Sequence, residues 1–286
     1  MTITITTSNV NGIRAAKRKG IEQWAAKNTP DVWCMQEVRA PQNEIDPIFD
    51  EFGFEYATAG RIADQSGLDR MNEICRIKGR AGVGLLSALP VIDKRYGLPG
   101  LAEDVDSGRW IEADVKTPQG YIVTVVCVYV HAGNTDDPEK MKQKYRFLDT
   151  MLVRMGQLRD EAAHGGKQAV LCGDFNIAHT PLDIKNAKAN EKHAGFLPEE
   201  RAYVDKWLGE LEFVDVMRSL CGDIQGPYTW WSQRGRAFDN NVGWRIDYQF
   251  ATPELAETAR GFVIDKAPTY DLRWSDHAPL SITYDV

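Results

Sequence analysis

The sequence lacks the features that mark membrane and secreted proteins. No run of about 18 consecutive apolar residues occurs, and the longest near-continuous apolar stretch, residues 122–130, has the length of a buried strand. Residues 1–10 alternate Ile with Thr and contain neither the basic region nor the apolar region of a signal peptide. We therefore expect a cytoplasmic protein with no membrane partner.

Cysteine is scarce and shows no paired spacing. The five cysteines stand 41 to 52 residues apart, with no C-x-x-C pair, which excludes a disulfide-stapled scaffold. Three of them fall inside strand-like apolar runs, so we expect reduced thiols that pack in the core. The five are Cys34, Cys75, Cys127, Cys172 and Cys221.

A basic excess is also missing. The chain has 34 Lys and Arg against 41 Asp and Glu, a net charge of −7, which argues against a protein that coats nucleic acid by bulk attraction. Two local basic clusters remain, and each is either a solvated helix face or a phosphate-binding patch. They are Arg14, Lys17, Arg18 and Lys19, and Lys140, Lys142, Lys144 and Arg146.

The chain contains no low-complexity stretch, short repeat or Pro/Gly/Ser-rich linker, so we expect one domain over residues 1–286. Apolar periodicity predicts strands that alternate with helices in both halves of the chain. This order predicts an α/β fold of two mixed β-sheets packed face to face with helices outside, a four-layer α/β sandwich. The expected strands are 2–8, 32–38, 82–87, 110–116, 121–130, 168–172, 213–216, 245–251 and 279–284, and the expected helices are 15–28, 138–163 and 198–208.

Polar side chains suited to a hard cation stand beside these strands. They are Asn9, Asn11, Glu37, Tyr129, Asp174, Asn176, Asp247, Asp276 and His277. Carboxylates and amides without a thiolate favour Mg²⁺. Each group alone has a simpler interpretation: Asp174 and Asn176 could form a turn, Glu37 could be an exposed edge residue, and His277 could belong to a capped loop.

Four motifs together resemble the endonuclease/exonuclease/phosphatase superfamily of metal-dependent phosphodiesterases, in that superfamily's order. They are residues 8–14 (SNVNGIR), 35–37 (MQE), 173–176 (GDFN) and 275–279 (SDHAP). The last three also occur in lipid and inositol phosphodiesterases. Three further features resemble the bacterial exonuclease III and abasic-site endonuclease branch: residues 9–14, residues 182–186 (LDIKN) with 195–201 (GFLPEER), and residues 242–248 (VGWRIDY).

The resemblance implies a metal site and a set of catalytic residues. It makes Glu37 the principal ligand of Mg²⁺, for which Mn²⁺ substitutes, with Asn9 and Asp276 close to the metal. It also includes Asp174, Asn176 and His277 among the residues of the metal site. A cation there would offset the repulsion between the phosphodiester and the carboxylates.

The same resemblance implies the division of catalytic work. Asp174 would orient or deprotonate the attacking water, and Asn176 would contact the scissile phosphate. Tyr129 and His277 would donate to phosphate oxygens, with His277 held by Asp247. Whether Asp174 or His277 is the base stays open, because an imidazole can either accept the proton or remain charged as a donor.

The substrate-binding residues that the resemblance implies are Asn11, Arg14, Trp230, Asn241, Trp244 and Ile246. Trp230, Trp244 and Ile246 would line a small apolar pocket for a flipped-out baseless sugar, although core packing is the alternative for the tryptophans. Neighbouring Arg and Asn side chains would bind phosphates without reading sequence. These neighbours are Arg234, Arg236, Asn240 and Arg245.

The function implied is a Mg²⁺-dependent DNA repair nuclease that hydrolyses the phosphodiester 5′ to abasic sites in duplex DNA. It would also remove nucleotides or blocking groups from 3′ ends, acting as a monomer. Two alternatives are the same chemistry on a phospholipid or inositol phosphate and a catalytically silent DNA-binding scaffold. One departure from the branch is the length of residues 60–78, which exceeds that of compact relatives.

Overall fold

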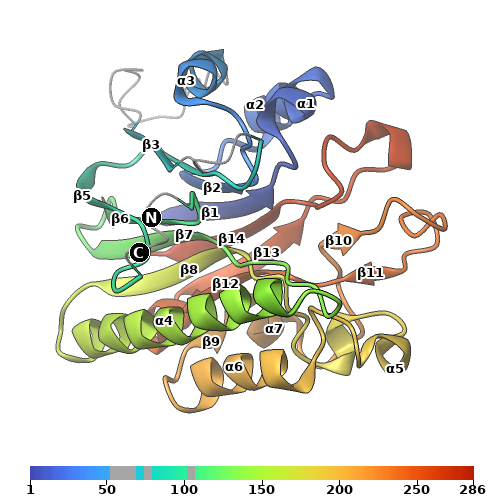
Figure 1. Cartoon of the computed structure of the whole chain (residues 1–286). Coiled ribbons are helices and arrows are strands. Elements are labelled where there is room, and N and C mark those ends of the chain that lie inside the picture. The colour runs from blue at the N-terminus through green and yellow to red at the C-terminus, as the bar shows by residue number, and fades with distance from the viewer. Residues whose placement is uncertain (52–68, 74–78, 102–106) are drawn as a thin grey trace.

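The computed structural model describes residues 1–51, 69–73, 79–101 and 107–286, and within them two six-stranded sheets face each other (Figure 1). The first sheet contains, in spatial order, β13 (Ala259–Ile264), β14 (Leu280–Asp285), β1 (Thr2–Asn9), β2 (Val32–Gln36), β4 (Val83–Ser87) and β3 (Asp69–Glu73). The second contains β5 (Val91–Tyr96), β6 (Trp110–Lys116), β7 (Ile122–Tyr129), β8 (Gln168–Asp174), β12 (Asp247–Ala251) and β9 (Val214–Asp215).

Each sheet has one parallel pair among antiparallel neighbours. β1 runs parallel to β2, and β7 runs parallel to β8, as strands joined by helical crossovers do. The remaining pairs in both sheets are antiparallel. The expected mixed sheets are therefore confirmed, and the carboxyl ends of four strands lie at one end of the sandwich.

Helices cover both outer faces, which completes the four layers (Figure 1). On the first sheet lie α1 (Ile13–Arg18), α2 (Ile21–Asn28) and α3 (Gln42–Glu51), and on the second lie α4 (Pro138–Ala163) and α6 (Pro198–Gly209). Shorter elements are α5 (Ala187–Asn190), α7 (Val216–Cys221), α8 (Pro253–Ala256), the turns η3 (Pro181–Asp183) and η4 (Tyr270–Leu272), and the ribbon of β10 (Trp230–Trp231) with β11 (Gly243–Trp244).

Alternate side chains of a strand point to opposite faces of the sheet, so one strand can contribute to two hydrophobic cores. In β7, Val125 and Cys127 belong to the core between the sheets, whereas Val126 and Val128 belong to the core under α4. Both faces are buried, which is why residues 122–130 form a nearly continuous apolar run.

Several predicted boundaries were wrong for local reasons. The helix expected over residues 15–28 is two helices, because Gly20 adopts a φ of 96° between α1 and α2. The strand expected over 213–216 is only β9, since the Asp215 side chain accepts the Arg218 N–H and starts α7. The strand expected from residue 245 begins at Asp247.

The thiol prediction is confirmed for Cys34, Cys127 and Cys172, which are buried between the sheets. Cys221 is a correction, because it is only half-buried at the end of α7. Cys75 lies outside the described residues, as does most of the segment 60–78. No helix in the described part of the chain has the length and apolar character needed to cross a membrane.

Candidate active site

Strand register brings the predicted polar residues together. Asp174, the last residue of β8, pairs with Tyr129 at the end of β7 and with Asp247 at the start of β12. Asn9 ends β1, and Glu37 follows β2 directly. The carboxyl ends of the parallel pair β1 and β2 and of the parallel pair β7 and β8 lie at the same end of the sandwich. Residues that are distant in sequence therefore converge on one site.

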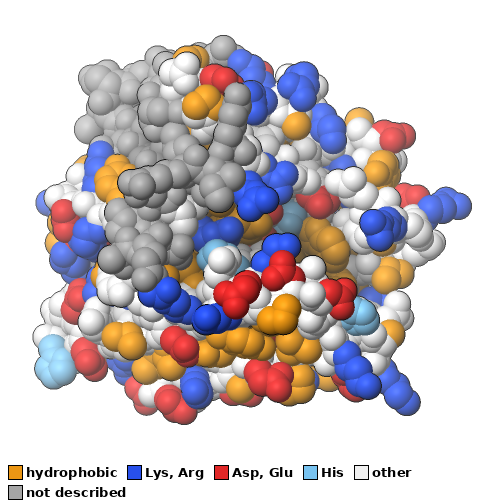
Figure 2. All heavy atoms as spheres, in the orientation of Figure 1, with side chains coloured by type: hydrophobic (Ala, Val, Ile, Leu, Met, Phe, Trp, Pro, Cys, Tyr) orange, Lys and Arg blue, Asp and Glu red, His pale blue; other side chains and the backbone are white. Residues whose placement is uncertain are grey.

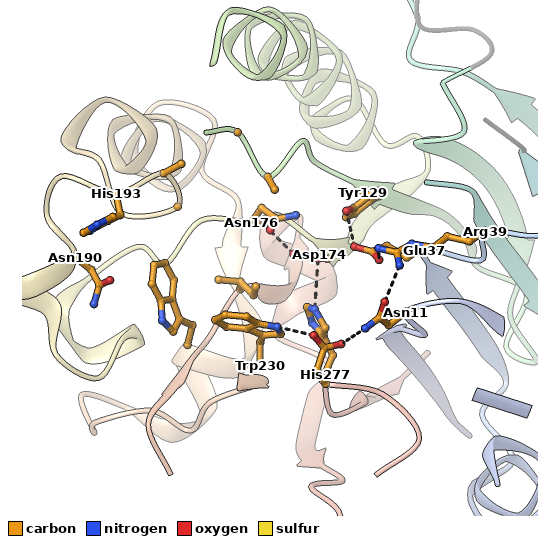
Figure 3. A pocket seen from close by; sticks show the side chains of 17 residues that line it. Asn11, Glu37, Arg39, Tyr129, Asp174, Asn176, Asn190, His193, Trp230 and His277 are labelled. Carbon is orange, nitrogen blue, oxygen red and sulfur yellow. Dashed lines mark hydrogen bonds and ion pairs between the residues drawn. The ribbon is translucent and has the colours of Figure 1, made fainter. Parts of the chain in front are cut away.

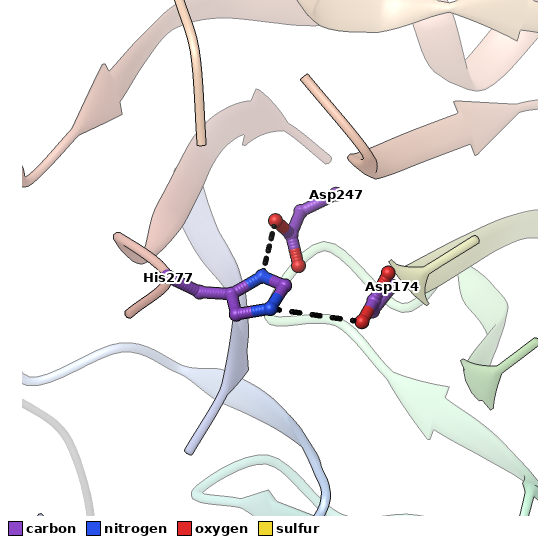
Figure 4. A group of neighbouring side chains, drawn as sticks. All are labelled: Asp174, Asp247 and His277. Carbon is purple, nitrogen blue, oxygen red and sulfur yellow. Dashed lines mark hydrogen bonds and ion pairs between the residues drawn. The ribbon is translucent and has the colours of Figure 1, made fainter. Parts of the chain in front are cut away.

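The centre of the site is a buried histidine between two aspartates (Figure 4). The Nδ1 atom of His277 lies 2.9 Å from Asp247 Oδ2, and its Nε2 atom lies 3.8 Å from Asp174 Oδ2. Burial by itself lowers the pKa of His277, but the charges of Asp247, Asp174 and Asp276 raise it to about 10. The ring is therefore an imidazolium at neutral pH, with both nitrogens carrying protons.

Asp174 is held by donors on its other side. Burial raises the pKa of Asp174 to about 7, against the lowering effect of His277 and of the Asn9 amide. Asn9 Nδ2 donates to Asp174 Oδ2 at 2.9 Å, and the backbone N–H of Asn176 donates to Oδ1 at 2.9 Å. These contacts fix the orientation of the carboxylate, and its pKa lets it exchange a proton near neutrality.

Glu37 faces the site from a strained backbone position. Its φ of 55° is left-handed, a conformation that is costly for a residue with a long side chain. The Tyr129 hydroxyl donates to Glu37 Oε1 at 2.5 Å, and the Arg39 guanidinium forms an ion pair with the same carboxylate. Burial, together with the Glu37 and Asp174 charges, raises the pKa of Tyr129 far above its usual value, so this hydroxyl remains a donor.

Asp276 is linked to Arg39 through one amide. Arg39 donates to Asn11 Oδ1 at 2.8 Å, and Asn11 Nδ2 donates to Asp276 Oδ1 at 2.7 Å. Trp230 Nε1 donates to Asp276 Oδ2 at 3.1 Å. Burial raises the pKa of Asp276, but the His277 charge and these two donors outweigh burial and lower it. Asp276 is therefore a charged carboxylate at neutral pH.

These groups open into a pocket of about 520 Å³ (Figure 3). Trp230, Trp244 and Ile246 form an apolar wall, with the two indole rings edge to face at a centroid separation of 5.9 Å. The polar wall contains Asn11, Glu37, Tyr129, Asp174, Asn176, Asp276 and His277. Lys and Arg side chains border a hollow in the middle of the face that Figure 2 shows.

Not every predicted residue reaches the pocket. Asn9 and Asp247 lie directly behind it, where they contact Asp174 and His277. Arg14 is outside it and pairs with Glu44 at 2.9 Å. Asn241 is also outside it, and its amide oxygen accepts from Trp231 at 3.0 Å and from Lys266 at 3.1 Å.

Two predicted basic contacts were wrong. Arg245 is buried, with its Nε 2.6 Å from Asp183 Oδ1 and its terminal nitrogen 2.7 Å from Asp215 Oδ2, so it is not available to a phosphate. Lys144 was placed in a basic cluster, but its side chain is completely buried beside Glu200. Tyr248 stands three residues after Arg245, and Phe147 stands three residues after Lys144. Both are core residues, so each cation belongs to an element that packs against a core.

Sequence reasoning missed part of the lining. Arg39 follows Glu37 by two residues, and Asn190, His193 and Gly195 come from the segment around α5. Asn190 and His193 lie between the two motif segments 182–186 and 195–201, which is the signal that could have pointed to them. The remaining lining residues are Ala132, Gly133 and Ala194.

The donors at the site suit a hard divalent cation. The polar atoms of Asp174, Asp247 and His277 lie within 4.8 Å of one another, but a protonated His277 has no lone pair to offer a metal ion, so the ligands must be the carboxylates. Glu37 and Asp276 add carboxylates that face the pocket, and no cysteine lines it. Oxygen-rich donors of this kind are those of Mg²⁺ and Mn²⁺ sites.

A sequence profile of the endonuclease/exonuclease/phosphatase family matches residues 6–277, a range that contains every residue of the site. The chain belongs to this family. Its similarity to an exodeoxyribonuclease of Bacillus subtilis is 29% identity over 279 residues, covering 97% of this chain and 98% of the relative.

Solved structures of similar proteins match this chain over nearly its whole length. An AP endonuclease from Archaeoglobus fulgidus matches with a TM-score of 0.81 and 30% identity, covering 99% of this chain and 100% of the other. A 3′-5′ exonuclease from Neisseria meningitidis matches with a TM-score of 0.78 and 27% identity over 99% and 100% of the two chains. The family fold thus extends from β1 to the segment before β14 that carries His277.

Proposed function

We propose that this family member is a Mg²⁺-dependent DNA repair nuclease that hydrolyses the phosphodiester 5′ to abasic sites in duplex DNA. We propose that it also removes nucleotides and blocking groups from 3′ ends. The observation that carries this proposal is one pocket with two walls: charged groups suited to a phosphate face an apolar wall of Trp230, Trp244 and Ile246.

The relatives support the same substrate. The Bacillus subtilis relative is named an exodeoxyribonuclease, and the Archaeoglobus structure is that of an AP endonuclease. A further neighbour, with 26% identity and a TM-score of 0.78, is a Neisseria 3′ phosphatase bound to a product DNA hairpin. These names cover both an internal cut beside a missing base and work at 3′ ends.

Mg²⁺ would be held at the pocket-facing carboxylates, with Glu37 as the principal ligand and Asp276 close by. When bound, the ion would polarise the phosphate and offset its repulsion by the surrounding carboxylates. Arg39 forms an ion pair with Glu37, so one positive charge already lies against this carboxylate. Asn9 would act by holding Asp174, because its two amide atoms are engaged by Asp174 and by the Asn11 N–H.

Asp174 is the better candidate for the base. An imidazolium has no lone pair to accept a proton, so His277 would instead donate from Nε2 to a phosphate oxygen. Asp174, with a pKa of about 7, could take the proton of the attacking water. Tyr129 and Asn176 would donate to the phosphate from the other side of the pocket, where both side chains point (Figure 3).

The apolar wall would receive the baseless sugar. A sugar without a base is extruded from the helix at less cost than a paired nucleotide, and the indole edges would exclude water around it. Asn11 lies between Arg39 and Asp276 at the polar edge of the pocket, where Asn11 and Arg39 could bind a flanking phosphate.

We further propose that the chain acts as a monomer, folded as one domain, in the cytoplasm. The support is that Asn11 near the start of the chain and His277 near its end line the same pocket. A site completed by one chain needs no second copy.

The test is a cleavage assay on an end-labelled duplex with one abasic analogue, with Mg²⁺ or EDTA, beside an undamaged duplex and the Asp174→Asn protein. We expect one Mg²⁺-dependent cut beside the abasic position that the variant does not make. Tight binding without cleavage would support a scaffold instead. Neither binding nor cleavage would direct the search to lipid and inositol phosphodiesters.

A further inference from the structure

A lysine lies buried behind the polar wall of the pocket. Lys144, in the first half of α4, has no exposed side-chain surface. Its ammonium group donates to the carbonyl oxygen of Asn176 at 2.9 Å and to that of Ala132 at 3.2 Å. Both of these residues line the pocket, one after β8 and one after β7.

The third partner of Lys144 extends the same support to the opposite wall. The Nζ atom lies 2.6 Å from Oε1 of Glu200, a buried residue of α6. The other oxygen of Glu200 accepts the N–H groups of Gly195 at 2.6 Å and Leu197 at 3.0 Å. Gly195 lines the pocket against Trp244, and a Cβ atom there would lie only 3.0 Å from the indole ring.

This ion pair therefore joins three separate pocket segments, around residues 132, 176 and 195. Asn176 has particular need of such support, because its φ of 50° removes it from regular strand pairing. Its side chain donates to Val130 O at 3.0 Å and its backbone carbonyl accepts from Lys144, so both the carboxamide and the carbonyl are held in place.

Stability alone gives little reason to bury this pair. Removing two charges from water is costly, and well-packed apolar replacements of buried ion pairs are often neutral or stabilising. An ammonium group differs from an apolar side chain in offering directed donors, and here two of them meet carbonyl oxygens while the charge pairs with the Glu200 carboxylate. The lysine therefore orients the groups that it contacts, which an apolar side chain of similar volume could not do.

We propose that Lys144 and Glu200 are positioning residues of the active site, which act by holding Asn176 in place against the phosphate. This inference rests on the proposed nuclease function. Small displacements of a positioned group can reduce turnover by about 100-fold without contact between the mutated residue and the substrate. The expected signature is a loss in kcat with little change in KM.

The test uses the full chain with Lys144→Met combined with Glu200→Gln, a neutral pair that keeps an acceptor for Gly195 and Leu197. On abasic duplex we expect kcat to fall by about 10- to 100-fold while KM changes by less than about threefold. If the double variant does not fold, Glu200→Gln alone is the second variant to measure, and its kcat should also fall.

Arg154→Met is the matched control. Arg154 also lies on α4 and also forms a buried ion pair, with its Nε 2.7 Å from Glu112, but neither residue is among those that line the pocket. This control should lose stability and keep its turnover per folded molecule. A comparable loss of kcat in the control would overturn the proposal, because a general loss of order in α4 would then explain both results.

A mutant cycle with Asn176→Ala separates positioning from a general structural effect. If Lys144 acts through Asn176, the Lys144→Met and Glu200→Gln changes should cost little further activity once the Asn176 side chain is gone. An equal loss in both backgrounds would refute the proposal, as would a folded double variant with unchanged kcat. Failure of the unmutated protein to cut abasic duplex would instead count against the proposed function.

Discussion

The Nε2 atom of His277 lies 3.8 Å from Oδ2 of Asp174. On the other side of the ring, Asp247 accepts from Nδ1 at 2.9 Å. The geometry resembles the base and orienting residue of a hydrolytic triad, but the charges differ. With its pKa raised to about 10, His277 is already protonated before any reaction begins.

This difference leads to a pH test with Asp247→Asn. Asp247 is the largest influence that raises the pKa of His277, and burial acts in the opposite direction. Without the Asp247 charge the pKa should drop toward neutrality, so the ring loses its proton as the pH rises. If His277 is a charged donor, single-turnover cleavage by the variant should decline from about pH 6 to about pH 9, relative to the unmutated protein. If His277 is the base, the relative rate should rise over the same interval.

Glu37→Gln should weaken metal-dependent turnover much more than folding. The substitution keeps the shape and the acceptor for Tyr129 but removes one ligand charge, so the Mg²⁺ concentration for half-maximal cleavage should rise by at least about 10-fold. Titration of Mg²⁺ in the cleavage assay measures this shift. Glu44→Gln is the control, because among the described residues that carboxylate pairs only with Arg14, outside the pocket. An unchanged Mg²⁺ requirement would remove Glu37 from the metal site.

Periodicity and turn signals were enough to predict the layers of this fold. Burial of one or both faces of a strand leaves a hydrophobic pattern in the sequence. The apolar run at 122–130 and the alternation at 2–8 are such patterns. The strands missed at β5 and β13 lie at sheet edges, and β5 carries the exposed charges Asp93 and Lys94. Charged edge strands prevent aggregation but lack the hydrophobic pattern of a strand.

The site was predictable to the extent that each residue stands in a motif. Asp174 and His277 could be named in advance, but their contact depends on how the two sheets face each other, because Asp174 ends β8 of one sheet and His277 precedes β14 of the other. The mistakes concern charged residues that fold inward. Lys144 and Arg245 read as surface cations because the acidic partners that allow their burial, Glu200 and Asp183, lie far away in sequence.

Trp244→Ala should impair cleavage at an abasic site more than it lowers stability. Trp244 is half-buried and lines the pocket against Trp230, so its removal takes away one wall rather than the centre of a core. We expect KM for abasic duplex to rise by about 10-fold, about 1.4 kcal/mol of lost binding. Trp24→Ala, a half-buried tryptophan of α2, is the control and should leave KM unchanged. A loss of several kcal/mol in unfolding free energy for Trp244→Ala would favour the core-packing interpretation.

Asp183 makes the support of the pocket wall sensitive to acid. Its carboxylate is buried against Arg245 and Arg218, next to the strand that carries Trp244. Burial raises the pKa of Asp183, but the charge of Arg245 and the donors around it lower the pKa from 3.8 to about 2. A carboxyl group with a depressed folded-state pKa stabilises the protein fully above its unfolded pKa, and this contribution disappears as the pH falls through the folded value. The ionised Asp183 should therefore contribute about 2 kcal/mol at neutral pH, of which about 1 kcal/mol is lost between about pH 5 and about pH 3.

Urea unfolding at both pH values should show the stability gap between the unmutated protein and Asp183→Asn shrinking by that amount. Asp205→Asn, which alters a carboxylate exposed on α6, should show no such change, and a gap for Asp183→Asn that is constant with pH would contradict the charge-based account.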